Sequence, residues 1–295
     1  MVAGLTRRRD AGLLARVPSG GLVVGAIASV QFGSSLAVTL FARLGPGGTV
    51  LLRLASAALV LMAVWRPRLR GHSREGLLLV IGFGIVLAGM NLSFYAAVQR
   101  IPLGIGVAVE FLGPLSVAVL GSHRRVDLVW VALAALGVLA LTGGGAHHLD
   151  VLGLALAVLA GCLWAAYIVL NARLGQAFAG STGLALAMCV AALVASPVGI
   201  ADGGAHLLDP ESLVLGGAVG LLSSAIPYSL ELEALRRLTP AAFGVLMSLE
   251  PAVAALAGFV VLGQGLRARA LSGIALVIVA SIGASRASAK LPISA

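Results

Sequence analysis

Long apolar segments alternate with short polar links along almost the whole 295-residue chain. Each segment contains about 20 residues, which is the length that a helix needs to cross a bilayer core of about 30 Å. The segments are continuous and do not alternate in polarity, which favours helices over the strands of a membrane barrel. We expect ten spans, at residues 20–41, 47–65, 76–97, 103–121, 126–143, 151–172, 180–201, 211–234, 240–262 and 268–286.

The composition supports the same class. Hydrophobic residues make up 60% of the chain and charged residues 11%, against about 45–50% and about 25% in soluble domains. The fold class predicted is therefore an all-α polytopic membrane protein. The two cysteines, Cys162 and Cys189, both lie in apolar segments and exclude a disulfide framework. The net charge of +9 fits membrane orientation better than nucleic-acid binding, because the basic residues lie between apolar segments.

The basic residues are distributed unevenly between the two sides that alternate spans define. Of the 20 Lys and Arg residues, 15 fall on the side of the N-terminus, four on the other side, and Arg53 inside a span. Cytoplasmic loops of membrane proteins carry an excess of Lys and Arg. We therefore expect both termini in the cytoplasm, which an even number of spans permits.

A weak internal repeat pairs spans three to five with spans eight to ten. Ala-Ala-Val-Gln-Arg-Ile-Pro at 96–102 corresponds to Ala-Leu-Arg-Arg-Leu-Thr-Pro at 234–240. A unit of five helices must insert its second copy upside down, which favours alternating-access transport, although channels and membrane enzymes also carry repeats. We expect a tail at 1–19, five-helix repeats at 20–143 and 151–286, and a tail at 287–295.

Two acidic residues, Glu110 and Glu250, lie deep inside predicted spans. At a rise of about 1.5 Å per residue, Glu110 is about 12 Å and Glu250 about 15 Å from the start of its span. A carboxylate at that depth costs at least about 2.5–3.5 kcal/mol and usually faces the protein interior or water. Two interpretations stay open: a site that holds a proton or a substrate ammonium, and a protonated structural acid that is hydrogen-bonded between helices.

A proline follows each acid, Pro114 four residues after Glu110 and Pro251 directly after Glu250. Proline removes a backbone donor and frees a carbonyl one turn earlier. The two positions are therefore either helix breaks that offer backbone groups to a ligand or plain structural kinks. Arg53 lies some six residues inside span two, where it either extends to the membrane surface or pairs with a substrate carboxylate or a glutamate.

Further polar side chains recur at helical spacing within the spans. They either line a polar cavity or belong to ordinary helix packing, and Tyr95 also suits an interfacial position. The candidate binding residues among them are Asn91, Tyr95, Trp164, Tyr167 and Tyr228, and the stripes also include Gln31, Ser34, Ser35, Asn171 and Ser224. Glu231 and Glu233 close span eight, whose last turn we expect outside the hydrocarbon. The spacing of Glu233 and Arg237 predicts a surface ion pair.

We expect no cofactor, no metal site and no enzymatic activity. The five histidines fall in loops, and no His-Glu-x-x-His pattern occurs at membrane depth. The chain has no Walker motif, and the Gly-x-Gly at 104–106 opens a span without a preceding strand. The expected partners are a small-molecule substrate, protons and the lipid bilayer. A membrane-embedded enzyme or a lipid-handling protein is the alternative from another class.

Several motifs resemble those of the EamA-type branch of the drug/metabolite transporter superfamily. They are Val-Ala-Val-Glu-Phe-Leu-Gly-Pro-Leu at 107–115, Arg-Arg-Val-Asp-Leu-Val-Trp-Val at 124–131, Tyr-Ser-Leu-Glu-Leu-Glu-Ala-Leu-Arg at 228–236 and Phe-Gly-Val-Leu-Met-Ser-Leu-Glu-Pro-Ala at 243–252. The resemblance covers most of the chain and is strongest over 91–141 and 228–285. Within the branch it is a resemblance to the exporters of small amino acids.

The resemblance implies a ten-helix exporter of the bacterial inner membrane, driven by the proton gradient and acting on amino acids of the threonine and homoserine kind. A multidrug or other metabolite exporter of the same fold is the alternative. Under this interpretation, Glu110 and Glu250 face one cavity, where one holds the substrate ammonium and at least one exchanges a proton. The family often has Leu-Gly-Glu where this chain has Leu-Gly-Gln at 262–264, so a role that needs a charge at that motif is not supported here.

Overall fold

The computed structural model describes residues 17–67, 73–120, 127–142, 150–178, 182–235, 238, 246–265 and 268–288. Within these ranges every regular element is a helix. The α-helices are α2 (Ser19–Thr39), α3 (Phe41–Trp65), α4 (Arg74–Val98), α5 (Leu103–Glu110), α6 (Leu112–Leu120), α7 (Asp127–Thr142), α8 (Val151–Ala177), α9 (Thr182–Gly203), α10 (Pro210–Gly220), α11 (Ile226–Leu235), α13 (Glu250–Leu262) and α14 (Ala268–Ser288). A 3₁₀ turn η1 (Gly204–Leu208) follows α9, and a π-helical turn η2 (Leu221–Ala225) joins α10 to α11.

The helices fall where the apolar segments predict them, so the all-helical class is confirmed for the described residues. Five stretches of the described chain are long and apolar enough to cross a membrane, and shorter apolar helices add to them. The five stretches are Ser19–Thr39, Phe41–Trp65, Arg74–Val98, Val151–Asn171 and Thr182–Leu208. The expected tails at 1–19 and 287–295 lie mostly outside the described residues.

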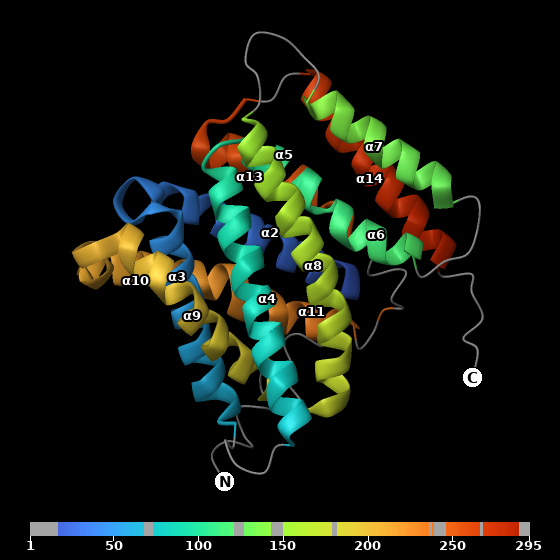
Figure 1. Cartoon of the computed structure of the whole chain (residues 1–295). Helices are drawn as coiled ribbons and strands as arrows, with labels where there is room; N and C mark the ends of the chain where they lie inside the picture. Colours follow the sequence, from blue (N-terminus) through green and yellow to red (C-terminus); the bar gives the residue numbers. More distant parts are fainter. Residues whose placement is uncertain are drawn as a thin grey trace.

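Three expected spans are interrupted. Span four divides at Phe111 into α5 and α6, and Figure 1 shows α6 running at an angle to α5. Span eight contains the π-helical turn η2. In span nine the helix α13 starts only at Glu250, and residues 241–245 lie outside the described part of the chain. The interruptions at Phe111 and Glu250 lie close to the two prolines noted in the sequence, Pro114 three residues after Phe111 and Pro251 directly after Glu250.

Helices from the two ends of the sequence pack against each other throughout the molecule. We call residues 17–142 the N-terminal half and residues 150–288 the C-terminal half. Helix α3 lies along α9, α4 along α8, and α7 along α14 (Figure 1). Each of these pairs joins one half to the other, so the interior between the halves is the natural place for a site.

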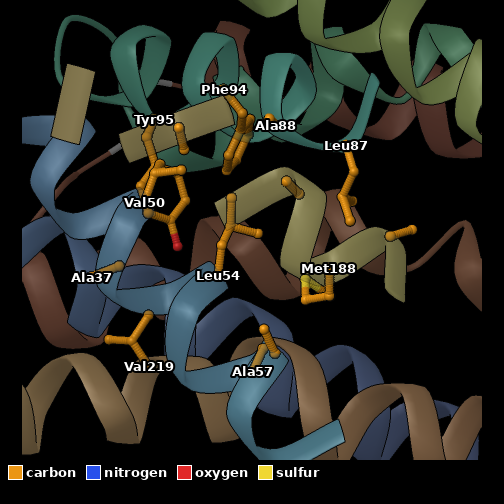
Figure 2. Close-up of a cluster of buried hydrophobic side chains, with 14 of the residues drawn as sticks. Ala37, Val50, Leu54, Ala57, Leu87, Ala88, Phe94, Tyr95, Met188 and Val219 are labelled. Atoms are coloured by element: carbon orange, nitrogen blue, oxygen red, sulfur yellow. The ribbon is translucent and has the colours of Figure 1, made fainter. Parts of the chain in front are cut away.

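The largest apolar cluster occupies part of this interior. Side chains of α2, α3, α4, α9 and α10 contribute to it, among them Ala37, Leu54, Phe94, Met188 and Val219 (Figure 2). The ring of Tyr95 lies in the same cluster (Figure 2). A polar group at the edge of this cluster is held in a dry environment, where its hydrogen bonds have little competition from water.

Candidate functional site

Glu250 is the first residue of α13 and is only 7% exposed. Pro251 follows it at the start of the helix, where the missing N–H of proline costs no hydrogen bond. The side-chain amide of Gln31 in α2 donates a hydrogen bond from Nε2 to Glu250 Oε1 at 2.9 Å. The remaining acceptors of this pair, Glu250 Oε2 and Gln31 Oε1, are buried and have no hydrogen-bond partner among the residues that the structure describes.

Glu110 is the last residue of α5 and is 8% exposed. Pro114 lies four residues later, so the carbonyl of Glu110 cannot receive the usual helical hydrogen bond from that residue. The same carbonyl packs against Gly161 of α8, where an added Cβ would lie 2.8 Å from the oxygen. The helix break at Glu110 is therefore fitted closely to a glycine of the C-terminal half.

The two acids belong to one electrostatic unit. Glu110 lies close enough to Glu250 and to Arg53 for their charges to interact. Glu250 interacts in the same way with Glu231 of α11. The charge of Glu110 thus falls within range of both Glu250 and Arg53, and Glu231, which the sequence suggests at an exposed helix end, falls within range of Glu250.

Arg53 does not extend to the membrane surface. It is 8% exposed, and its guanidinium donates from Nη1 to the Tyr95 hydroxyl at 2.9 Å and from Nη2 to the Ser223 carbonyl at 3.2 Å. The guanidinium carbon also lies 5.4 Å from the centre of the Tyr95 ring. Tyr95, 0% exposed, therefore belongs to the site rather than to an interfacial belt.

The remaining candidates are placed less uniformly. Trp164 packs edge-on against Phe111, with ring centres 5.5 Å apart, and so lies beside the Glu110 break. Tyr167 instead contacts Phe83 in the large apolar cluster. Asn91 is buried, but its side chain donates to the Leu87 carbonyl of its own helix at 2.8 Å. The side chain of Tyr228 lies outside the described residues, as does the expected Glu233–Arg237 pair.

Two further groups belong to the site, and the sequence carries a signal for one of them, because Pro227 lies four residues after Ser223 and has no N–H to donate to the Ser223 carbonyl. Gln31 belongs to a predicted polar stripe, but its partner Glu250 is 219 residues away along the chain. The Ser223 carbonyl belongs to η2, and π-helical turns have altered backbone hydrogen bonding and occur often at functional sites. The stripe of Gln31 with Ser34 and Ser35 is buried, as a polar stripe facing the protein interior should be.

Comparison with known proteins identifies the family. A threonine/homoserine exporter, RhtA, of Escherichia coli K12 is 43% identical over 266 residues, which cover 90% of this chain and 90% of the exporter. The homologous exporter of Salmonella typhimurium LT2 is 42% identical over 262 residues, or 88% of each chain. The EamA-like transporter family matches residues 151–286. The chain belongs to the EamA-like transporter family.

A solved crystal structure supports the fold of this EamA-like transporter. It shares 18% sequence identity with a TM-score of 0.61, over 90% of this chain and 96% of the other. Membership of a family of membrane transporters agrees with the buried acids, because such acids mark ion and substrate pathways in membrane proteins. Among the described residues no group of three His, Cys, Asp or Glu side chains is arranged to hold a metal ion.

Proposed function

We propose that this transporter exports small amino acids of the threonine and homoserine kind, or closely related metabolites, in exchange for protons. The observation that carries the proposal is the buried Gln31–Glu250 pair with two unsatisfied acceptor atoms. Buried acceptors without donors are costly, and a substrate ammonium or a proton on the carboxylate supplies the missing donor. The names of the relatives point to the same class of substrate.

In this proposal one carboxylate serves two ligands in turn. Glu250 holds the substrate ammonium when deprotonated and releases it when it takes up a proton. The substrate carboxylate is met by Arg53 and by backbone groups freed at the two helix breaks. Because proton and substrate compete for the same group, each stabilises a different state of the protein, and exchange follows without nucleotide hydrolysis.

The architecture that we propose has ten spans arranged as two inverted five-helix repeats, residues 20–143 and 151–286, with both termini in the cytoplasm. The two helix breaks support it, since Glu110 and Glu250 each interrupt the fourth span of their half. Alternating access then moves the two halves about a site near the bilayer midplane. The excess of basic residues on the side of the N-terminus supports the orientation.

Transport by purified protein in proteoliposomes tests this function. Vesicles loaded with labelled threonine or homoserine are diluted into buffers that impose or omit a pH difference. We expect efflux that accelerates when the outside is more acidic, and homoserine should compete with threonine. Glu250→Gln and Glu110→Gln are compared with wild type at equal incorporation, and unchanged efflux in both variants would remove the carboxylate mechanism.

The same vesicles separate the alternatives. A lipophilic cation transported in place of the amino acids would indicate a multidrug exporter of the same fold. A chemical product formed in detergent without any gradient would indicate a membrane-embedded enzyme or lipid-handling protein. Either result would replace the proposed function.

A further inference from the structure

One end of the molecule is held together by polar contacts between the two halves. It contains the start of α3, the junction of α4 and α5, the start of α8, and the loops after α9 and α13. In Figure 1 the loop after α9 leads into α10 at the left of the molecule, and α5 and α13 lie above it. We call this end the clasp face. Four contacts at this face each join a residue of the N-terminal half to one of the C-terminal half. In two of them a backbone N–H donates to a side-chain oxygen, a carboxylate in one and a glutamine amide in the other, and the remaining two are ion pairs.

The first contact lies at the start of the part of α3 that carries Arg53. The helix is broken at Gly45, whose φ of 63° lies in the left-handed region, and Pro46 begins the straight part. Asp202, near the end of α9, accepts a hydrogen bond from the Gly47 amide at 2.9 Å. An added Cβ at Gly47 would lie 2.7 Å from the same carboxylate oxygen, so glycine leaves the space that the cap needs. A carboxylate there also interacts favourably with the positive end of the helix dipole.

The second contact lies at the start of α5, the helix that carries Glu110. Gln264, directly after α13, accepts from the Leu103 amide at 3.0 Å through Oε1. Leu103 is the first residue of α5, and Glu110 is its last. Gly263 has a φ of 64° and ends α13, and the Gln264 amide bonds back to the Gly258 carbonyl at 3.1 Å. This turn directs the Gln264 side chain towards the start of α5. A neutral acceptor is sufficient there to receive the hydrogen bond from the Leu103 amide.

Two exposed ion pairs complete the clasp face. Arg43 pairs with Glu211, and Arg100 pairs with Asp150 at 2.9 Å. The Glu211 hydrogen bond raises the pKa of Arg43 further above its ordinary value. The other end of the described chain differs, because there α2 meets α11 through apolar side chains such as Leu22, Leu230 and Ala234. In the described part of the chain the clasp face thus joins the halves through polar contacts and the opposite end through apolar ones, while Gln31–Glu250 and Arg53–Ser223 join the halves in the interior between them.

We propose that Asp202 and Gln264 are positioning residues that couple the site to the closure of the clasp face. Each caps, from the C-terminal half, a helix of the N-terminal half that bears a site residue. While the face is closed, both helices are capped and Arg53 and Glu110 are held in place. Opening of the face must break both caps together. The proposal rests on the proposed function, since it assumes that the two halves separate during transport.

Transport kinetics distinguish positioning from general destabilisation. We expect Gln264→Leu and Asp202→Ala to raise the KM for threonine by about three- to thirtyfold, the range that loss of a helix cap supports. Gln264→Glu and Asp202→Asn keep an acceptor atom and should restore most of the affinity. His206→Ala is the control, because its partner Asp209 lies in the same half. Unchanged KM in both cap-removing variants, at any Vmax, would overturn the positioning role.

A cross-link tests whether the clasp face opens. In a background with Cys162 and Cys189 replaced by alanine, a thiol-specific linker joins Arg43→Cys to Glu211→Cys across the halves. We expect transport to fall at least about tenfold and to return when the linker is cleaved. The control links His206→Cys to Asp209→Cys within one half and should leave transport unchanged. Normal transport by the protein cross-linked between halves would contradict the proposal.

Hydrogen exchange tests the clasp without any substrate, so its result is independent of the proposed function. If the two caps open together, Gln264→Leu should speed amide exchange about tenfold both in residues 103–106 and in residues 47–49. Ser73→Ala is the matched control, because Ser73 caps α4 within the N-terminal half at the other end of the molecule, accepting from the Gly76 amide at 3.1 Å. It should affect only residues 74–77. Faster exchange in residues 103–106 alone would show a local cap and would overturn the clasp.

Discussion

Glu110 and Glu250 occupy corresponding places in the two proposed repeats, yet the chain positions them differently. Glu110 ends a helix and Glu250 begins one. The start of a helix favours an anion and its end favours a cation. Glu250 is therefore supported as an anion by its own helix, whereas Glu110 depends on the nearby charge of Arg53. The same residue type at a proline-associated break thus acquires two distinct environments.

Hydrogen bonding separates the two acids further. Within the described ranges, Glu250 receives one donor, from Gln31, and retains an oxygen without a donor. Among the residues that the structure describes, none donates a hydrogen bond to the Glu110 carboxylate. Arg53 reaches Tyr95 and Ser223 and influences Glu110 by charge. We infer that Glu250 binds the exchanged ligand and that the charge of Glu110 changes the electrostatic potential at Glu250.

The largest expected effect comes from Glu250→Gln, which keeps the size and removes the charge. Loss of one charged partner in a buried pair costs about 2–5 kcal/mol, so threonine transport should fall on the order of 30-fold or more. Efflux from proteoliposomes measures it. Ser35→Ala is the control in the same region, because its hydroxyl donates to the Gln31 carbonyl of its own helix. A loss smaller than that of Glu110→Gln would reverse the proposed order of the two acids.

Gly161→Ala tests how closely the Glu110 break depends on its neighbour. The new Cβ would lie 2.8 Å from the Glu110 carbonyl, and such overpacking typically costs about 1–3 kcal/mol of unfolding free energy. Thermal unfolding in detergent should show a lower midpoint. Gly82→Ala is the matched control, because nothing lies within 4 Å of its added Cβ. Equal midpoints for the two variants would mean that α8 does not constrain the break.

Glu110→Gln should have a milder effect, because the Gln31–Glu250 pair remains intact. We expect transport to fall about fivefold, equivalent to about 1 kcal/mol. A double variant with Glu250→Gln should be no worse than Glu250→Gln alone, since residues of one network are not additive. Two independent losses that multiply in the double variant would show that the acids act separately.

Asp150 is the exposed counterpart of the two buried acids, and its replacement should have the smallest effect. The Gly153 amide and then the Arg100 guanidinium hold the pKa of Asp150 below its ordinary value. Its stabilising contribution is therefore present above the ordinary aspartate pKa and is lost as the pH falls through the lowered folded value. Asp150→Asn should lower the thermal midpoint slightly at pH 7 and not at pH 2, with transport changed less than about threefold. An equal loss of stability at both pH values would exclude this titration.

Much of this arrangement is predictable from the sequence. Apolar segment length locates the helices, and the cost of a charge in hydrocarbon singles out Glu110 and Glu250. Proline chemistry anticipates both helix breaks. These features are local, because each is decided by residues within a few turns of one another.

The parts that escape prediction depend on contacts between distant segments. Arg53 has two sequence interpretations, and only its contacts with Tyr95 and Ser223 decide between them. The π-helical turn Leu221–Ala225 contains no proline itself, although Pro227, four residues after Ser223, already predicts a carbonyl without its usual helical donor there. Gln264 lacks the charge typical of the family motif, but the cap on α5 requires only an acceptor oxygen, which glutamine also supplies.

Proton release on substrate binding tests the central claim most directly. Purified protein in weakly buffered detergent is mixed with threonine while a pH indicator is followed. The account predicts that wild-type protein releases protons as threonine binds, and that Glu250→Gln releases none. Binding of threonine to wild type without proton release, or equal release by Glu250→Gln, would contradict competition between substrate and proton for one carboxylate.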